Sequence, residues 1–215
     1  MSKQPQILTV SVLFLFLLIS ACLPAMASDV KADERRVRSG LKLFRSMLAA
    51  DLDIKNKVTS DGRLHILLVH HQHKGDVNQF AKELSQLGQG QGKGKVHHIP
   101  LKITVISQQA LTKPLTKPLT KPLTKPQPPI AGVYLIESLP DHGLQQIVDY
   151  GIKHQVVVYS PFAGDVEKGI LGGMVISAQM RPLINTNTMN AAKLRIKPFY
   201  LKTAQHFPNI TQPLR

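Results

Sequence analysis

Apolar positions along this chain switch between helical and strand-like spacing. Residues 33–51 carry an apolar side chain at about every third or fourth position, which predicts an amphipathic helix whose polar side is rich in Arg and Lys. Residues 76–87 repeat that spacing, and residues 144–152 predict a third helix. Short apolar or β-branched runs predict strands at residues 64–69, 102–107, 130–136 and 155–159.

Strands and helices therefore alternate along the chain. Alternation of this kind, with strands that are almost continuously apolar, predicts a three-layer α/β domain built on a mostly parallel sheet. Ligands of such sheets bind beyond the carboxyl ends of the strands. The sequence thus indicates a candidate site formed by the loop that begins at His70 and the loop Ser160–Phe162.

The N-terminal segment has the pattern of a secretory signal peptide over residues 1–27. Lys3 is followed by an apolar run over residues 7–21 and then by Ala25-Met26-Ala27, a small-residue cleavage site. The run is shorter than the roughly 20 apolar residues that cross a bilayer. We expect a periplasmic protein that is soluble after cleavage near Ala27. The residues before Cys22 also fit a lipoprotein cleavage site, so a chain anchored through Cys22 is the alternative.

A Leu-Thr-Lys-Pro motif recurs four times between residues 111 and 126. Proline at every fourth position removes backbone donors and moves the preceding residue out of the helical region. Residues 107–129 are therefore predicted to be a flexible, disordered insertion. It interrupts a single α/β domain over residues 28–206, which a tail over residues 207–215 follows.

Charge narrows the classes of partner. Lys and Arg outnumber Asp and Glu by 27 to 13, for a formal net charge of +14. This balance favours acidic partners, such as an anionic membrane surface. We expect no nucleic-acid partner, because the chain has no Trp, only 5% aromatic residues with which to stack bases, and an export signal. A homo-oligomer is compatible with the sequence.

The sequence does not contain the usual signatures of an enzyme. There is no G-x-S-x-G motif, and the single cysteine, Cys22, lies in the signal segment. The glycine-rich stretch at residues 88–95 does not match a phosphate-binding loop. We therefore expect a protein that is not an enzyme and has no cofactor.

Histidines are the remaining candidates for site chemistry. Several gather beside the predicted end of the first strand and the turn before the next, and they are candidate ligands for zinc, copper or nickel. These residues are His70, His71, His73, His97 and His98. No acid or cysteine completes a zinc motif around them. Exposed loop histidines are the competing interpretation.

The last quarter of the chain resembles a known family. It contains GGMVIS at residues 172–177, RPLIN at 181–185, NAAKLRI at 190–196 and LKTA at 201–204. These segments resemble the C-terminal signature of the YfiR-like periplasmic family, and VVVYS at 156–160 resembles the segment before it. The resemblance lies mainly over residues 155–206. It implies a C-terminal antiparallel strand pair, opened by a Gly-Gly step and followed by a helix of small residues.

What the resemblance implies for function is an exported, non-catalytic α/β protein. Such a protein binds and restrains a membrane-embedded diguanylate cyclase, or a related membrane signalling protein such as a sensor kinase, from the periplasmic side. Together with the loop predicted above, the resemblance gives tentative partner- or ligand-binding residues. They are Phe44, Ser160, Phe162, Gly172, Gly173 and Asn185.

Structural roles compete with these assignments. Gly172 and Gly173 are also typical of a strand-entry bend, and Asn185 is also typical of the cap of a helix over residues 186–193. A second function likewise competes with the first. It is a periplasmic small-ligand or metal-binding component of an envelope transport system, with its site in a pocket past the strand ends.

Overall fold

The structure is a computed structural model of the chain, and it describes residues 31–72, 76–112 and 129–208. The chain divides into two compact units, residues 1–35 and 36–215, and the second is described below. The predicted signal peptide with Cys22, the residue His73, most of the Leu-Thr-Lys-Pro repeat and the residues after Pro208 lie outside the described residues.

An eight-stranded sheet forms the centre of the second unit, in the order β2-β3-β1-β4-β5-β6-β7-β8. Strands β3, β1, β4, β5 and β6 run parallel, whereas β2 pairs antiparallel with β3 and β6 pairs antiparallel with β7. The strands are β1 Leu64–His70, β2 Lys95–Val96, β3 Ile99–Ser107, β4 Gly132–Leu135, β5 Val157–Tyr159, β6 Gly172–Ile176, β7 Met180–Asn185 and β8 Gln205–Phe207. The predicted α/β class, the mostly parallel sheet and the C-terminal antiparallel pair are confirmed.

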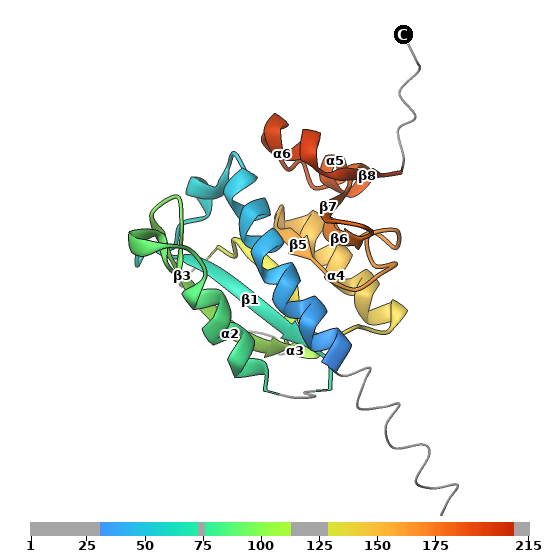
Figure 1. Cartoon of the computed structure of the whole chain (residues 1–215), viewed down its shortest axis with the longest axis horizontal. Helices are drawn as coiled ribbons and strands as arrows, with labels where there is room; N and C mark the ends of the chain where they lie inside the picture. The colour runs from blue at the N-terminus through green and yellow to red at the C-terminus, as the bar shows by residue number, and fades with distance from the viewer. Residues whose placement is uncertain (1–30, 73–75, 113–128, 209–215) are drawn as a thin grey trace, which may run out of the picture. The chain divides into compact units, whose positions relative to one another are not determined.

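Helices connect and cover the strands (Figure 1). The first described helix covers residues 31–50. The others are η1 Ile54–Lys57, α2 Val77–Gln86, η2 Gly90–Gly92, α3 Gln108–Thr112, α4 Asp141–His154, α5 Thr186–Ala191 and α6 Pro198–Thr203. Asp76 begins α2, because its carboxylate accepts hydrogen bonds from the backbone N–H groups of Asn78 and Gln79. Gln155 ends α4 in the left-handed conformation, with φ of 54°.

Two apolar clusters lie on opposite faces of the sheet and give the predicted three layers. Alternate strand residues, such as Ile66 and Tyr134, pack with the helix 36–50 and with α2 on one face. Their neighbours, such as Leu67 and Val133, pack with α4 on the other. Side chains that alternate across a strand therefore supply both cores.

The domain boundaries differ slightly from those expected at two places. Ser107, the predicted first residue of the insertion, ends β3, and its hydroxyl accepts a hydrogen bond from the Ala110 N–H in α3. Gln108 fixes α3 by donating to Gln146 Oε1 of α4 at 2.7 Å. Phe207, the predicted first residue of the tail, lies in β8. The Gln108 contact and the pairing of β8 with β7 are long-range, so local composition does not reveal them.

The buried hydroxyl of Tyr134 supplies a test of the packing between the helix 36–50 and β4. It donates to the backbone carbonyl of Val37 at 2.6 Å. We expect Tyr134→Phe to lower the free energy of unfolding by about 1–2 kcal/mol, because a buried carbonyl loses its donor. Urea unfolding measures this loss. Tyr150→Phe, at a half-buried position in α4, is the control and should change stability by less; equal effects would contradict the assigned role.

Candidate functional site

The carboxyl ends of the parallel strands β1, β4 and β5 lie at the same end of the sheet, as predicted. Because β4 lies between β1 and β5, the loop after β1 and the loop after β5 are not adjacent. Glu137, just after β4, contacts the first of them: its Oε2 accepts hydrogen bonds from the backbone N–H groups of His71 and Gln72, both at 2.8 Å. Sequence reasoning missed this acid, although an acid directly after a predicted strand was a usable signal.

Ser160 and its loop are buried and occupied by their own contacts. The Ser160 hydroxyl donates to Asp165 Oδ2 at 2.5 Å and accepts from the Phe162 N–H at 3.2 Å. Burial raises the pKa of Asp165 above its usual range, and the hydrogen bond from Ser160 opposes that rise. Within the described residues, the Ser160 hydroxyl has no hydrogen bond to a histidine base. The pair therefore closes the loop, and its geometry is not that of an activated nucleophile.

Phe44, Gly172 and Gly173 lie in the core. Phe44 is fully buried and its ring packs 5.2 Å from that of Tyr134, centroid to centroid. A Cβ on Gly172 would collide with Met47 Sδ, and one on Gly173 would lie 2.9 Å from the Ser160 carbonyl oxygen. These glycines permit close packing of the helix 36–50 and the β5 loop on β6.

Asn185 has the structural role that was one of its two interpretations. Its Oδ1 accepts from the Thr188 N–H at 3.0 Å and caps α5, while its Nδ2 donates to the Val166 carbonyl at 2.7 Å. Both ends of the buried amide are thus satisfied by the protein.

The proposed histidine cluster is wrong for His97 and His98. They are the two central residues of the β2–β3 turn, with φ of 49° and 67°. This turn precedes β3, whereas His70 and His71 end β1, and β1 and β3 run parallel. The two pairs lie at opposite ends of strands of about seven residues, roughly 20 Å apart. In the described part of the chain, no group of three or more His, Cys, Asp or Glu residues is arranged to hold a metal ion.

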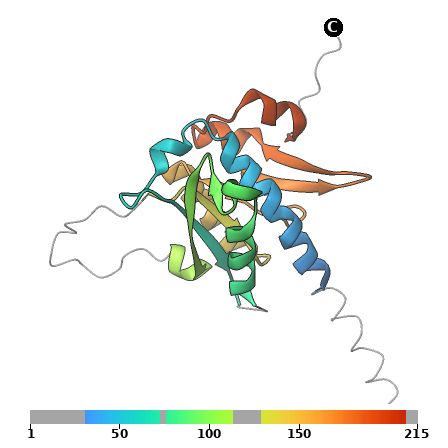
Figure 2. The ribbon, with the colours of Figure 1, turned by 60° about the vertical axis from the view of Figure 1, so that its left-hand side comes forward.

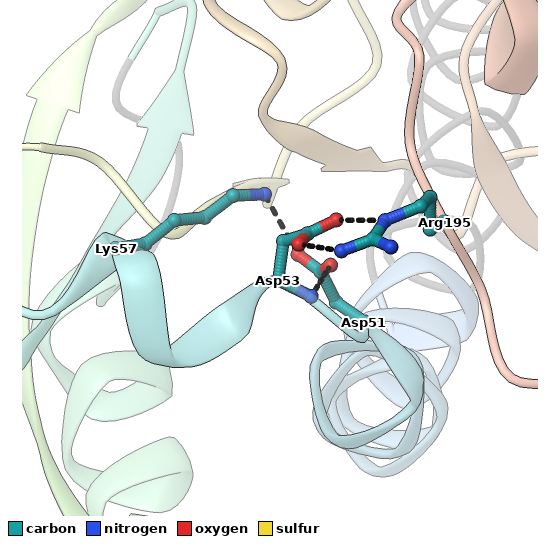
Figure 3. Close-up of polar contacts among 4 residues, drawn as sticks. All are labelled: Asp51, Asp53, Lys57 and Arg195. Atoms are coloured by element: carbon teal, nitrogen blue, oxygen red, sulfur yellow. Dashed lines mark hydrogen bonds and ion pairs between the residues drawn. The ribbon is translucent and has the colours of Figure 1, made fainter.

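A cluster of paired charges joins the end of the helix 36–50 to the segment before α6 (Figure 3). Asp51 is 1% exposed and pairs with Lys57 Nζ at 2.7 Å. Asp53 accepts hydrogen bonds from Nε and Nη2 of the Arg195 guanidinium, and that hydrogen bonding lowers the Asp53 pKa. Backbone hydrogen bonds link the same segments, including Leu52 N to Arg195 O at 2.9 Å. The cluster is a structural clamp, because its charges are paired with one another.

Exposed apolar side chains lie at two places that the sequence analysis did not identify. Ile176 and Met180 flank the tip of the β6–β7 hairpin, and Phe199 in α6 is 80% exposed. Figure 2 shows this hairpin extending away from the body of the sheet. Their exposure depends on tertiary packing, which local composition does not reveal.

Comparisons with known proteins give only distant likenesses. No protein-family model and no curated protein matches the chain. Among solved structures, the chain is similar to an ABC domain from Streptococcus pneumonia in complex with L-Trp, with 11% identity, a TM-score of 0.48, and coverage of 76% of this chain and 61% of that one. A conserved domain protein from Vibrio cholerae has 11% identity, a TM-score of 0.44, and coverage of 71% and 57%.

A ligand-free substrate binding protein with adhesive properties from Clostridium difficile gives similar values: 11% identity, a TM-score of 0.44, and coverage of 74% and 60%. The chain spans about three fifths of the length of these structures. Likeness at this level transfers no ligand and no activity. In residues 31–72, 76–112 and 129–208, no helix has the length and apolar character needed to cross a bilayer.

Asp165 predicts a specific dependence of stability on pH. Its folded-state pKa is raised, so the folded state holds the proton more tightly than the unfolded chain does. The stability that this carboxyl contributes is full below the unfolded pKa of about 3.9 and is lost as pH rises through the folded pKa. We therefore expect Asp165→Asn, which cannot ionise, to gain stability relative to the wild type as pH rises from about 3.5 to about 7.

Urea unfolding at a series of pH values measures this difference. Glu167→Gln, which removes an exposed carboxyl from the same loop, is the control. If rising pH instead stabilised the wild type relative to Asp165→Asn, burial would not be the dominant influence on the Asp165 pKa.

Proposed function

We propose that this protein is an exported, non-enzymatic binding protein that contacts a membrane signalling protein through its C-terminal segment. The observation that supports this most directly is the exposure of Ile176, Met180 and Phe199 in that segment. The residues first considered for binding in the core, Phe44, Gly172 and Asn185, are instead buried. Contiguous exposed apolar surface is typical of sites that bind proteins, and Ile176 and Met180 are neighbours across the β6–β7 hairpin.

Charge indicates the chemistry of the partner. After Glu167 the sequence contains no Asp or Glu. The described part of this segment exposes Arg181, Lys193 and Lys202, while Arg195 is paired with Asp53. A partner surface that combines acidic and apolar side chains complements it. The resemblance of residues 155–206 to YfiR-like proteins favours a diguanylate cyclase or sensor kinase as that partner.

Regulation follows if the partner's two activity states bind this surface with different affinity. A protein that binds the inactive state more tightly shifts the partner toward inactivity without any chemistry of its own. This mechanism needs no catalytic group, in agreement with the closed Ser160–Asp165 pair.

In-cell photo-crosslinking tests the proposal. We expect photoreactive residues at Ile176 and Phe199 to capture a membrane protein with a cytoplasmic signalling domain, identified by mass spectrometry. A probe at Lys82, exposed in α2, is the control position. Lys202→Glu should reduce capture at Phe199, in the same helix, by about tenfold, because a favourable charge at the interface is reversed, whereas Lys82→Glu should not. Capture only at Lys82, or of a permease, would contradict the proposal.

The Glu137 contact favours a second function, the binding of a small anion. Backbone N–H groups from the loop after β1 already hold a carboxylate there, at 2.8 Å. The chain passes from β1 to β3 on one side and then to β4 on the other, so this loop lies at the point where strand order reverses. Small ligands of open α/β sheets bind at such points.

Removal of the Glu137 carboxylate tests this second function. If the loop binds anions, acetate or phosphate should raise the melting temperature of Glu137→Ala saturably and more than that of the wild type, because the freed N–H groups donate hydrogen bonds to the added anion. Glu167→Ala, with the same change in charge, is the control. Equal responses of the two variants would contradict anion binding at this loop, and partner binding would remain as the proposed function.

A further inference from the structure

We propose that β3 is a dimerisation edge, at which a second copy of this chain adds its own β3 antiparallel and extends the sheet. The inference is independent of the partner-binding surface. It follows from three properties of the strand: one side is largely uncovered, its backbone groups there lack partners among the described residues, and its sequence is compatible with itself in one register.

Among the residues that the structure describes, only the start of β3 is covered on the side away from β1. The short strand β2 pairs with Ile99 and Pro100, and the Leu101 N–H donates to the Gly94 carbonyl at 3.0 Å. No described strand pairs with residues 102–107 on that side, although the same residues pair with β1 along their whole length on the other. In the described ranges the sheet therefore ends in an open edge of about six residues.

The contact of Leu101 fixes the direction of the groups that follow. Because backbone groups of a strand point alternately to its two sides, the N–H and C=O groups of Ile103 and Val105 point away from β1, as those of Leu101 do. Within the part of the chain that the structure describes, these groups have no hydrogen-bond partner. Unpaired backbone groups in a row are a template for another strand.

The side chains along this edge do not protect it. Proteins block open edges with proline, charge or a bulge. Residues 101–107 read Leu-Lys-Ile-Thr-Val-Ile-Ser, with one charge and no proline. Of these, Ile103, Val105 and Ile106 are half-buried, so a neighbouring strand would cover apolar surface on both faces.

The β3 strands of two copies can pair antiparallel in a register centred on Thr104. Ile103 then lies opposite Val105 of the second copy, and this outward-pointing pair exchanges two hydrogen bonds, as does its symmetry mate. Lys102 lies opposite Ile106 of the second copy, so no like charges meet. Because Leu101 already bonds to Gly94 of its own chain, only residues 102–106 of each copy can pair with the other copy. An isologous contact of this kind closes as a dimer.

Thr104 would face itself across the two-fold axis, with its Cα about 4.5 Å from its counterpart. This gives a charge-swap test on the full-length protein purified after export, with mass measured by sedimentation equilibrium. We expect the wild type to have twice the mass of one chain. Thr104→Lys and Thr104→Glu should each have the mass of one chain, and an equal mixture of the two should regain the doubled mass.

Gln109→Lys and Gln109→Glu, at an exposed position in α3, are matched controls and should remain dimers. Val105→Pro gives a second test, because the N–H that it removes is not bonded to β1 and proline is tolerated at such edge positions. We expect this variant to have the mass of one chain and a wild-type circular dichroism spectrum.

A wild-type mass of one chain would overturn the proposal, and so would a folded Thr104→Lys that remains dimeric or a mixture that stays at single mass. A wild type that instead carries a co-purified foreign peptide at this edge would also overturn it. None of these outcomes involves Ile176 or Phe199, so they leave the partner-binding proposal unaffected.

Discussion

The close approach of the helix 36–50 to the sheet is the constraint on which the rest of this structure depends. Phe44 and Leu48 lie so near β4 that a Cβ on Gly132 would come within 2.8 Å of both side chains. On the helix, a Cβ on Gly40 would lie 2.5 Å from the Tyr134 hydroxyl. Close contact of this kind leaves no room between helix and sheet, because protein interiors are packed to the density of crystals.

This packing decides which residues remain available for binding. Met47 fills the space above Gly172, and Phe44 packs against Tyr134 and Tyr159, so the family-like glycines and the early aromatic residue serve the core. The clamp of Asp51 and Lys57, with Asp53 and Arg195 beside it, then ties the end of this helix to the C-terminal segment. The features that remain exposed are the tip of the β6–β7 hairpin, Phe199 and the edge of β3.

The sequence predicted the fold better than the site, for two physical reasons. Periodicity reports which face of an element is apolar, so residues 33–51 and 64–69 were assigned correctly. It does not report which polar side chains find partners: Ser160 was assigned to a binding loop, yet Asp165 and Phe162 occupy its hydroxyl. The error for His97 and His98 comes from strand direction. Because β1 and β3 run parallel, the turn before β3 lies at the opposite end of these strands from the carboxyl end of β1, where His70 lies.

Strand order determines where the two proposed surfaces lie relative to each other. In the order β2-β3-β1-β4-β5-β6-β7-β8, β3 lies near one edge of the sheet and the strands β6, β7 and β8 form the other. A dimer joined through β3 therefore carries its two C-terminal surfaces at opposite ends of one continuous sheet. Two copies of a signalling protein in the membrane are contacted together only if their spacing matches that span, in which case the second contact forms at high effective concentration. If both proposals hold, dimerisation at an edge remote from the binding surface also selects the arrangement of the partner.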